Sequence, residues 1–212
     1  MTVDPSMTSS YPFSSAITTD TDNSVHYRMN NITHLSTAVQ DIHPGEELTI
    51  SYIDVQLSRK ERQSRLDDWG FKCKCAHCTM SDAEVAASDA RIERVATIQG
   101  HMEKMVAGQI PIDTALADEL VRGYEDERFL TNIGHAYTRA ALVHSLKGNE
   151  KEAREMAKKA AEAMELEYGM QNKDAQAMKL LSEDLTAHWS WNALKRSEKR
   201  PEEREGQQQD AA

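Results

Sequence analysis

Three cysteines within six residues give this sequence its most specific chemical signal. Cys73, Cys75 and Cys78 follow the spacing Cys-x-Cys-x-x-Cys, and they are the only cysteines among the 212 residues. Thiolates bind Zn²⁺ at about 2.3 Å, and Zn²⁺ takes four ligands in a tetrahedron. The spacing therefore predicts a zinc site with three protein sulfurs. The fourth position is left open to His77, to another segment of the chain or to water.

Two other uses of these cysteines are weaker interpretations. An odd number of closely spaced cysteines does not form the even framework of a secreted, disulfide-rich domain. A redox pair would be expected in a strand-helix context, which this segment lacks. Unligated cysteines remain the alternative to a zinc site. The pattern favours zinc in a protein of a reducing compartment.

The composition limits the partners of the protein. Asp and Glu outnumber Lys and Arg by 35 to 25, so the formal net charge is −10, which argues against direct binding to a phosphate backbone. The N-terminus has no basic start followed by an apolar run, so no signal peptide is predicted. No segment reaches the ~18 apolar residues of a membrane span. We expect an intracellular protein, nuclear or cytoplasmic, that contacts neither membrane nor nucleic acid directly.

Strands are predicted on the N-terminal side of the cysteines. Apolar and polar residues alternate at 24–29, 32–42 and 47–52, and the turns between these segments contain Asn30-Asn31 and Pro44-Gly45. This region is interpreted as a small β-meander. Residues 1–22 are rich in Ser and Thr and are expected to form a disordered arm.

Helices are predicted around and after the cysteines. A charged helix at 58–69, with Arg62 expected in solvent, ends at Gly70. Ser81 and Glu84 have the spacing of a capping box that opens the next helix. Further helices fit residues 113–122, 125–147, 149–168 and 173–194, and the tail 195–212 is expected to be disordered. The predicted fold class is α+β: a small β-meander, a cysteine knuckle and a mainly helical region.

One predicted helix pair has a more specific pattern than the others. The turn Gly148-Asn149 separates two segments in which small and large apolar residues would meet across a tight hairpin. This pattern resembles a tetratricopeptide-type (TPR-like) hairpin. Because no second clear copy is evident, a generic helical hairpin is the alternative.

Two motifs in this order resemble those of SET-domain protein lysine methyltransferases. Residues 44–52, PGEELTISY, are similar to the last core motif of the SET domain, and residues 65–78, which contain RL, WGF and the three cysteines, are similar to the post-SET zinc knuckle. The order and spacing are most similar to those of fungal SET proteins and SMYD-type enzymes. The resemblance divides the chain into the C-terminal part of a SET domain (23–57), a post-SET helix and knuckle (58–80) and a helical, TPR-like region (81–194).

The resemblance implies a reaction and the residues that serve it. Such enzymes transfer a methyl group from S-adenosylmethionine to a lysine ε-amine of a histone or another protein. By this resemblance Tyr52 is a catalytic residue that lines the lysine channel. Asn23, Tyr52 and Phe71 are implied to bind the cofactor. Zinc on the three cysteines is implied to hold Phe71 in place.

The chain also departs from the family pattern. The family signature Asn-His-x-Cys-x-Pro-Asn would fall on residues 17–23, where this chain has ITTDTDN and keeps only Asn23. Asp20 stands where the family has the cysteine that supplies the fourth zinc ligand. The first half of a SET domain has no counterpart, so we expect a C-terminal portion with weak or no activity alone. The alternatives are a non-catalytic interaction module that binds peptides through its helices and a plain helical scaffold.

Overall fold

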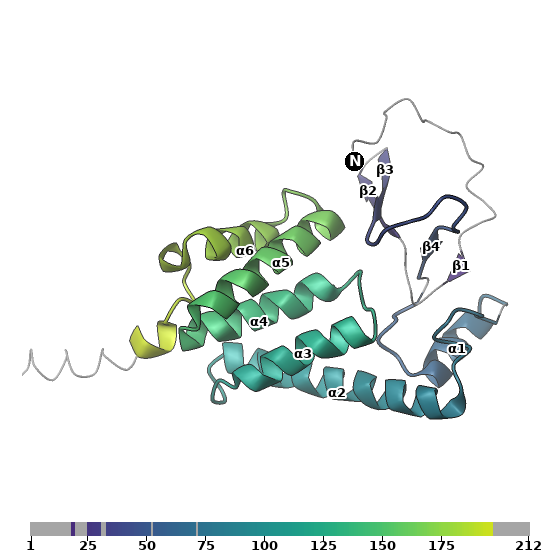
Figure 1. The fold of residues 1–212 in the computed structure, drawn as a ribbon, viewed down its shortest axis with the longest axis horizontal. Coiled ribbons are helices and arrows are strands. Elements are labelled where there is room, and N and C mark those ends of the chain that lie inside the picture. Colours follow the sequence, from purple (N-terminus) through teal and green to yellow (C-terminus); the bar gives the residue numbers. More distant parts are fainter. Residues whose placement is uncertain (1–17, 20–24, 31–32, 52, 71, 197–212) are drawn as a thin grey trace, which may run out of the picture.

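The computed structural model describes residues 18–19, 25–30, 33–51, 53–70 and 72–196. Strands dominate the N-terminal part and helices the rest of this described chain (Figure 1). None of the helices in these ranges is long and apolar enough to cross a membrane. The elements are β1 (Thr18–Thr19), β2 (Val25–Asn30), β3 (Thr33–Ala38), β4 (Thr49–Ile50), α1 (Arg59–Asp67), α2 (Asp82–Val106), α3 (Thr114–Asp126), α4 (Ile133–Lys147), α5 (Glu150–Tyr168), α6 (Lys173–Glu183) and a 3₁₀ helix, η1 (Leu185–Ala187).

The strands form two separate pairs. β2 and β3 make the predicted antiparallel hairpin, with Val25 opposite Ala38. The predicted meander is not formed by the described residues, because β4 pairs in parallel with β1 and not with β3. The alternation of residues predicts a strand but not its partner, and a parallel partner becomes possible because the whole hairpin serves as the crossover. β1 also lies within the segment 1–22 that was expected to be disordered.

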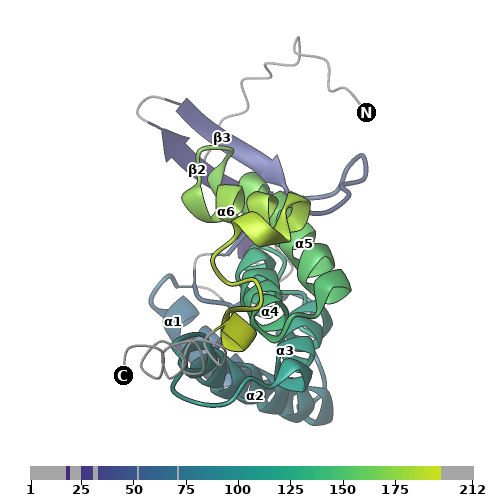
Figure 2. The same cartoon turned by 90° about the vertical axis from the view of Figure 1, so that its left-hand side faces the viewer.

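The helices α2 to α6 pack one on the next in chain order (Figure 1). Two buried clusters hold them together. The first joins α2, α3 and α4 through residues such as Ile98, Leu120 and Val143. The second joins α4, α5 and α6, and its α5 face consists of small residues, Ala153, Ala157 and Ala160, all fully buried. The hairpin β2–β3 contacts α5 (Figure 2).

Two of the predicted helices are shorter than expected. The predicted helix at 125–147 begins only at Ile133, because Arg128 takes a positive φ of 53° and turns the chain. The turn buries Phe129 edge-on against the ring of Tyr124, with centroids 5.5 Å apart. The predicted helix at 173–194 stops at Glu183, where the Asp184 side chain instead accepts hydrogen bonds from the amides of η1. Burial and capping thus override continuous helical periodicity.

Two local signals in the sequence are confirmed. Ser81 caps α2 and its side chain accepts from the Glu84 amide, while the Glu84 side chain accepts from the Ser81 amide, which is the predicted capping box. Gly148 ends α4 in the left-handed conformation, with a φ of 82°, and the next residue leads into α5. Both features depend on residues within one turn of each other, so the sequence specifies them directly.

We expect Gly123→Ala to destabilise the protein by about 1–3 kcal/mol, because the added carbon overpacks the core between α2 and α3. A Cβ at Gly123 would lie 2.5 Å from Cγ2 of Val95, a side chain that is only 2% exposed. Gly100, also in a helix, has no atom within 4 Å of such a carbon. Gly100→Ala is therefore the control, and helix propensity should stabilise it by about 1 kcal/mol. Urea unfolding followed by circular dichroism measures both, and destabilisation of equal size in the two variants would contradict the α2–α3 packing.

Candidate metal centre

The Sγ atoms of Cys73, Cys75 and Cys78 converge on one point. All three lie within 4.8 Å of one another. Three atoms with this spacing fit on a circle of about 2.8 Å radius, slightly wider than the Zn–S bond of about 2.3 Å. Small side-chain rotations would bring every sulfur to bonding distance from a shared ion. A set of three thiol sulfurs suits a soft or borderline cation such as Zn²⁺ and not a hard, oxygen-seeking cation such as Mg²⁺.

Backbone hydrogen bonds shape the loop that brings these sulfurs together. The Cys78 amide donates to the carbonyl oxygen of Cys75 at 3.0 Å and also faces the Cys75 sulfur at 3.3 Å. The Thr79 amide and hydroxyl both donate to the same Cys75 carbonyl, at 3.0 and 2.9 Å. An N–H group directed at a sulfur stabilises its thiolate form. The loop is therefore arranged for metal binding by its own backbone.

Neighbouring thiols oppose the ionisation of Cys73 and of Cys78. Hydrogen bonding with Cys75 raises the pKa of Cys73, and hydrogen bonding with Cys73 and Cys75 raises the pKa of Cys78, with a further contribution from burial. A divalent cation removes this opposition, because its charge stabilises the thiolates that bind it. Metal binding at this cluster should release protons and weaken as the pH falls.

His77, one of the candidates for the fourth ligand, has a different partner. It is 7% exposed, and its Nε2 lies 3.7 Å from Oε2 of Glu127. Its ring nitrogens are not part of the converging group of ligand atoms. The other protein candidate, Asp20, lies outside the described residues. Within the described ranges, the site is therefore built from three cysteine ligands.

The segment after β4 is anchored to the helical region. Val55 is buried in the core of α2, α3 and α4. The Gln56 side-chain amide donates to the Tyr124 hydroxyl at 3.0 Å, and Gln99 of α2 donates to the same hydroxyl. Burial raises the pKa of Tyr124, so the phenol stays protonated. The short connection between β4 and α1 is thereby fixed to α2 and α3.

Helix α1 connects this segment to the far side of the cysteine loop. The Arg59 guanidinium donates to the Met80 carbonyl at 3.2 Å and to the Asp82 carboxylate at 2.8 Å. The Arg59 amide donates to the Asp89 carboxylate of α2 at 2.9 Å. These contacts join the start of α1 to the start of α2, so the cysteine loop between them is held at both ends.

The buried face of α1 differs from the one expected. Arg62 is 2% exposed, and its guanidinium donates to the Leu57 carbonyl, so the prediction that it lies in solvent is wrong. It shares the buried face with Leu66, which is 1% exposed, whereas Trp69 is 62% exposed. Residue type alone suggested that Arg62 is exposed. A long arginine side chain can nevertheless bury its apolar stem while its guanidinium donates to a backbone carbonyl.

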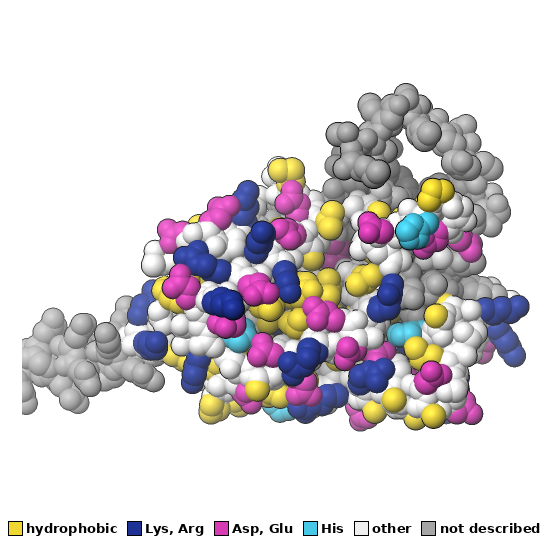
Figure 3. All heavy atoms as spheres, in the orientation of Figure 1, with side chains coloured by type: hydrophobic (Ala, Val, Ile, Leu, Met, Phe, Trp, Pro, Cys, Tyr) yellow, Lys and Arg dark blue, Asp and Glu magenta, His cyan; other side chains and the backbone are white. Residues whose placement is uncertain are grey.

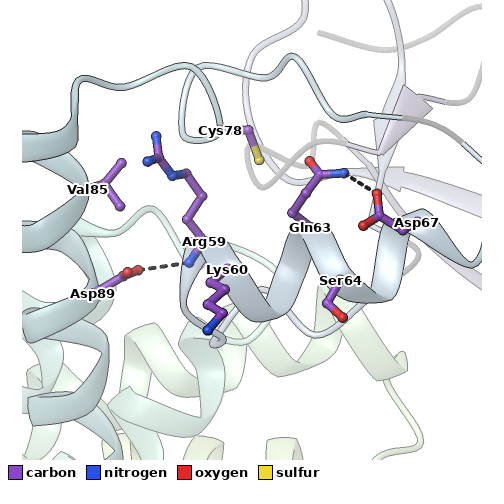
Figure 4. Close-up of a pocket in the computed structure, with 8 residues that line it drawn as sticks. All are labelled: Arg59, Lys60, Gln63, Ser64, Asp67, Cys78, Val85 and Asp89. Atoms are coloured by element: carbon purple, nitrogen blue, oxygen red, sulfur yellow. Dashed lines mark hydrogen bonds between the residues drawn. The ribbon is translucent and has the colours of Figure 1, made fainter.

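An open groove of about 620 Å³ lies between α1, the cysteine loop and α2 (Figure 4). Six of its eight lining residues have polar or charged side chains, and on its α1 wall the Gln63 amide donates to Asp67, one helical turn along, at 3.0 Å. Since Cys78 lies on the wall, the groove gives solvent and small ions access to the metal-binding loop. Its lining residues are Arg59, Lys60, Gln63, Ser64, Asp67, Cys78, Val85 and Asp89.

Asn23, Tyr52 and Phe71, the other predicted site residues, lie outside the described residues, and their roles remain predictions. Beside Tyr52 in the sequence, the Ser51 hydroxyl donates to the Ile53 carbonyl at 2.7 Å. Sequence reasoning missed Glu127, which contacts His77 from 50 positions away. No local pattern could have shown a contact of that range.

Acidic and basic side chains are mixed on the face of the helical region seen in Figure 3. The excess of acidic residues in the sequence does not form a single acidic patch on this face. Individual pairs cross between helices, such as Arg94 of α2 with Glu119 of α3 at 2.7 Å. No patch of a single charge sign therefore marks a binding site on this face.

Comparison with known proteins adds evidence about the family. No protein-family model matches the chain. A 55-residue stretch, 26% of this chain, is 46% identical to the N-lysine methyltransferase SMYD2 of Sus scrofa and covers 13% of that protein. A 48-residue stretch (23% of this chain) is 48% identical to the histone-lysine N-methyltransferase ATXR2 of Arabidopsis thaliana and covers 10% of it. A 70-residue stretch, 32% of this chain, is 40% identical to the histone-lysine N-methyltransferase set5 of Schizosaccharomyces pombe and covers 22% of that protein.

The matches to these relatives span only between 10% and 22% of the relatives' lengths. They nevertheless come from a mammal, a plant and a yeast, and all three relatives carry lysine methyltransferase names. The cysteine cluster is compatible with a metal-binding knuckle in such a protein. Together, these partial similarities support a relationship of this chain to the SET-domain lysine methyltransferases.

Proposed function

We propose that this chain supplies the C-terminal part of a SET domain, its zinc knuckle and the following helices to an S-adenosylmethionine-dependent protein-lysine N-methyltransferase. The observation that carries the proposal is the convergence of the Cys73, Cys75 and Cys78 sulfurs within 4.8 Å. This convergence occurs in the segment whose sequence resembles the post-SET knuckle. The short similarities to lysine methyltransferases support the same conclusion.

The proposed reaction is a displacement at the methyl carbon of S-adenosylmethionine. The lone pair of a neutral lysine ε-amine forms the new N–C bond while the C–S bond breaks and S-adenosylhomocysteine leaves. The methylated ammonium then loses a proton to water. Such a displacement requires that the amine, methyl carbon and sulfur be held in line. The substrate class is a protein lysine, on a histone or on another protein.

Each proposed site residue has a role that fits its chemistry. The Tyr52 hydroxyl accepts a hydrogen bond from the amine and so orients it toward the methyl carbon. The Phe71 ring packs on the cofactor through its flat apolar face. Asn23 contacts the cofactor through its amide. Zinc, when bound, cross-links Cys73, Cys75 and Cys78 and so limits the motion of Phe71, two residues before Cys73.

The sequence also sets the expected level of activity. Only Asn23 remains of the family signature at residues 17–23, so the contacts that its Asn and His would make are missing from this chain. Catalysis by positioning depends steeply on such contacts. Methyl transfer by the chain alone is therefore expected to be slow.

A methyl-transfer assay tests the proposed function. The zinc-loaded chain is incubated with S-adenosylmethionine carrying a labelled methyl group and with a mixture of histones, and mass spectrometry locates the label. We expect slow labelling of lysine side chains above the level found with heat-denatured chain. Labelling confined to other residue types, or none above the denatured control from a folded, zinc-loaded chain, would contradict the proposal.

The helical region is proposed to be TPR-like and to serve as a surface for peptide segments of the substrate. Four large apolar side chains are exposed on α5, α6 and the loop between them: Leu166, Tyr168, Met170 and Leu180. Met170 is the most exposed, at 72%. Exposed large apolar side chains are a feature of protein- and peptide-binding surfaces. This binding role is the second candidate function, and it holds whether or not the chain transfers methyl groups.

A further inference from the structure

Glu127 is a fully buried carboxylate at the junction between the cysteine loop and the helices. It is 0% exposed. The Ser88 hydroxyl donates to its Oε2 at 2.6 Å, and Nε of Arg91 donates to its Oε1 at 2.5 Å. Nε2 of His77 lies 3.7 Å from Oε2. A buried carboxylate needs several such partners, because burial without them would cost several kcal/mol.

The partners of Glu127 come from separate parts of the chain. Ser88 and Arg91 lie on α2, Glu127 follows the last residue of α3, and His77 lies in the loop between the metal-binding cysteines. The carboxylate therefore joins three elements at one point. Of these partners, only His77 is next to proposed zinc ligands, since it directly precedes Cys78.

The environment of His77 makes Glu127 its main polar neighbour. The His77 ring is 7% exposed, and its Nδ1 is buried without a hydrogen-bond partner in the described part of the chain. Its other ring nitrogen is the one that faces Glu127. The 3.7 Å separation is longer than a hydrogen bond, so the contact is electrostatic, and rotation of the buried ring away from Glu127 would lose it. The contact with Glu127 thus fixes the orientation of this side chain.

We propose that Glu127 is a positioning residue for the metal-binding loop, acting through His77. The contact holds the segment Cys75–Cys78 against α2 and α3 in the conformation in which the sulfurs converge. Less of the binding free energy is then used to order the loop, so zinc binds more tightly. Coupling is reciprocal, so zinc must in turn strengthen the attachment of the loop to the helices. The inference rests on the proposed zinc site but not on methyl transfer.

The first test is the zinc affinity of Glu127→Gln, measured by competition with a chromogenic chelator. Groups that orient metal ligands from the outer shell contribute about 10–100-fold to affinity, and we expect a loss of about tenfold here. Glu119→Gln is the matched control. It removes a second Arg–Glu pair, Arg94 of α2 with Glu119 of α3 at 2.7 and 2.8 Å, in an exposed position. The control should bind zinc within about twofold of wild type if only the contact with the loop matters.

A second variant separates positioning from a general loss of stability. His77→Ala removes the loop side of the contact and leaves Ser88 and Arg91 paired with Glu127. We expect it to lose about as much zinc affinity as Glu127→Gln, and the double variant to lose no more than either single one. Additive losses, or wild-type affinity in Glu127→Gln, would overturn the proposal. Circular dichroism of each apo variant checks that the helices remain folded.

The outcomes also separate this inference from the proposed function. A wild-type chain that binds no zinc would remove the metal site itself and the positioning role with it. A chain that binds zinc with equal affinity in all variants would remove only the role of Glu127. Methyl transfer to lysine can fail while both zinc binding and its dependence on Glu127 are observed.

Discussion

Cys75→Ser is expected to weaken zinc binding by more than about a hundredfold and to leave the helical region folded. Cys75 is the most buried of the three cysteines, and its sulfur faces the Cys78 amide at 3.3 Å. Structural zinc sites bind with about 10–16 kcal/mol, so loss of one ligand in four is worth roughly 3 kcal/mol. That energy corresponds to a loss of affinity of more than about a hundredfold.

The helices should survive because their core does not include the cysteine loop. The buried clusters of α2 to α6 consist of residues from Ile92 onward, together with Val55. Zinc content by atomic emission and helix content by circular dichroism are measured on the same sample. Ala76→Ser, at an exposed position of the same loop, is the control and should keep its zinc. Collapse of the helices in Cys75→Ser would show that the loop and the helical region are not separate units.

Tyr52→Phe is expected to reduce methyl transfer to lysine by about a hundredfold, the typical effect of removing one hydrogen-bonding group aimed at the reacting atoms. The ring and its packing are retained, so zinc content and thermal stability should not change. The variant is compared with wild type in the labelled-methyl assay on histones.

Tyr137→Phe is the matched control for this variant. Tyr137 lies on α4, and its hydroxyl donates to Glu125 at 3.0 Å, so the substitution removes a tyrosine hydroxyl from the helical region only. Its transfer rate should equal that of wild type. Undiminished transfer by Tyr52→Phe would exclude the Tyr52 hydroxyl from the reaction, and equal losses in both variants would indicate an effect on folding.

The features that the sequence predicts correctly are local ones. Ser81 and Glu84 are three residues apart, and their capping box needs no information from the rest of the chain. Gly148 ends α4 because a left-handed residue is required there and glycine adopts that conformation without strain. The convergence of Cys73, Cys75 and Cys78 is local in the same sense, since a single short loop contains all three.

The features that the sequence does not predict depend on contacts between distant residues. β4 pairs with β1, some 30 positions earlier, because alternation sets the face of a strand and not its partner. In the sequence, Glu127 has the character of a solvent-exposed helical residue. In the fold it is buried, and Ser88 and Arg91 of α2 donate hydrogen bonds to its carboxylate. In each case a tertiary partner reverses what residue type alone suggests.

The measurement that tests the central claim most directly is a calorimetric titration of S-adenosylmethionine into the chain with and without zinc. If the metal-held loop forms one wall of the cofactor site, the zinc-loaded chain should show saturable binding, and removal of zinc by a chelator should abolish it. Cys75→Ser should then behave like the zinc-free chain. Absence of binding by the zinc-loaded chain, or equal binding in both states, would contradict the claim that the knuckle serves a methyltransferase site.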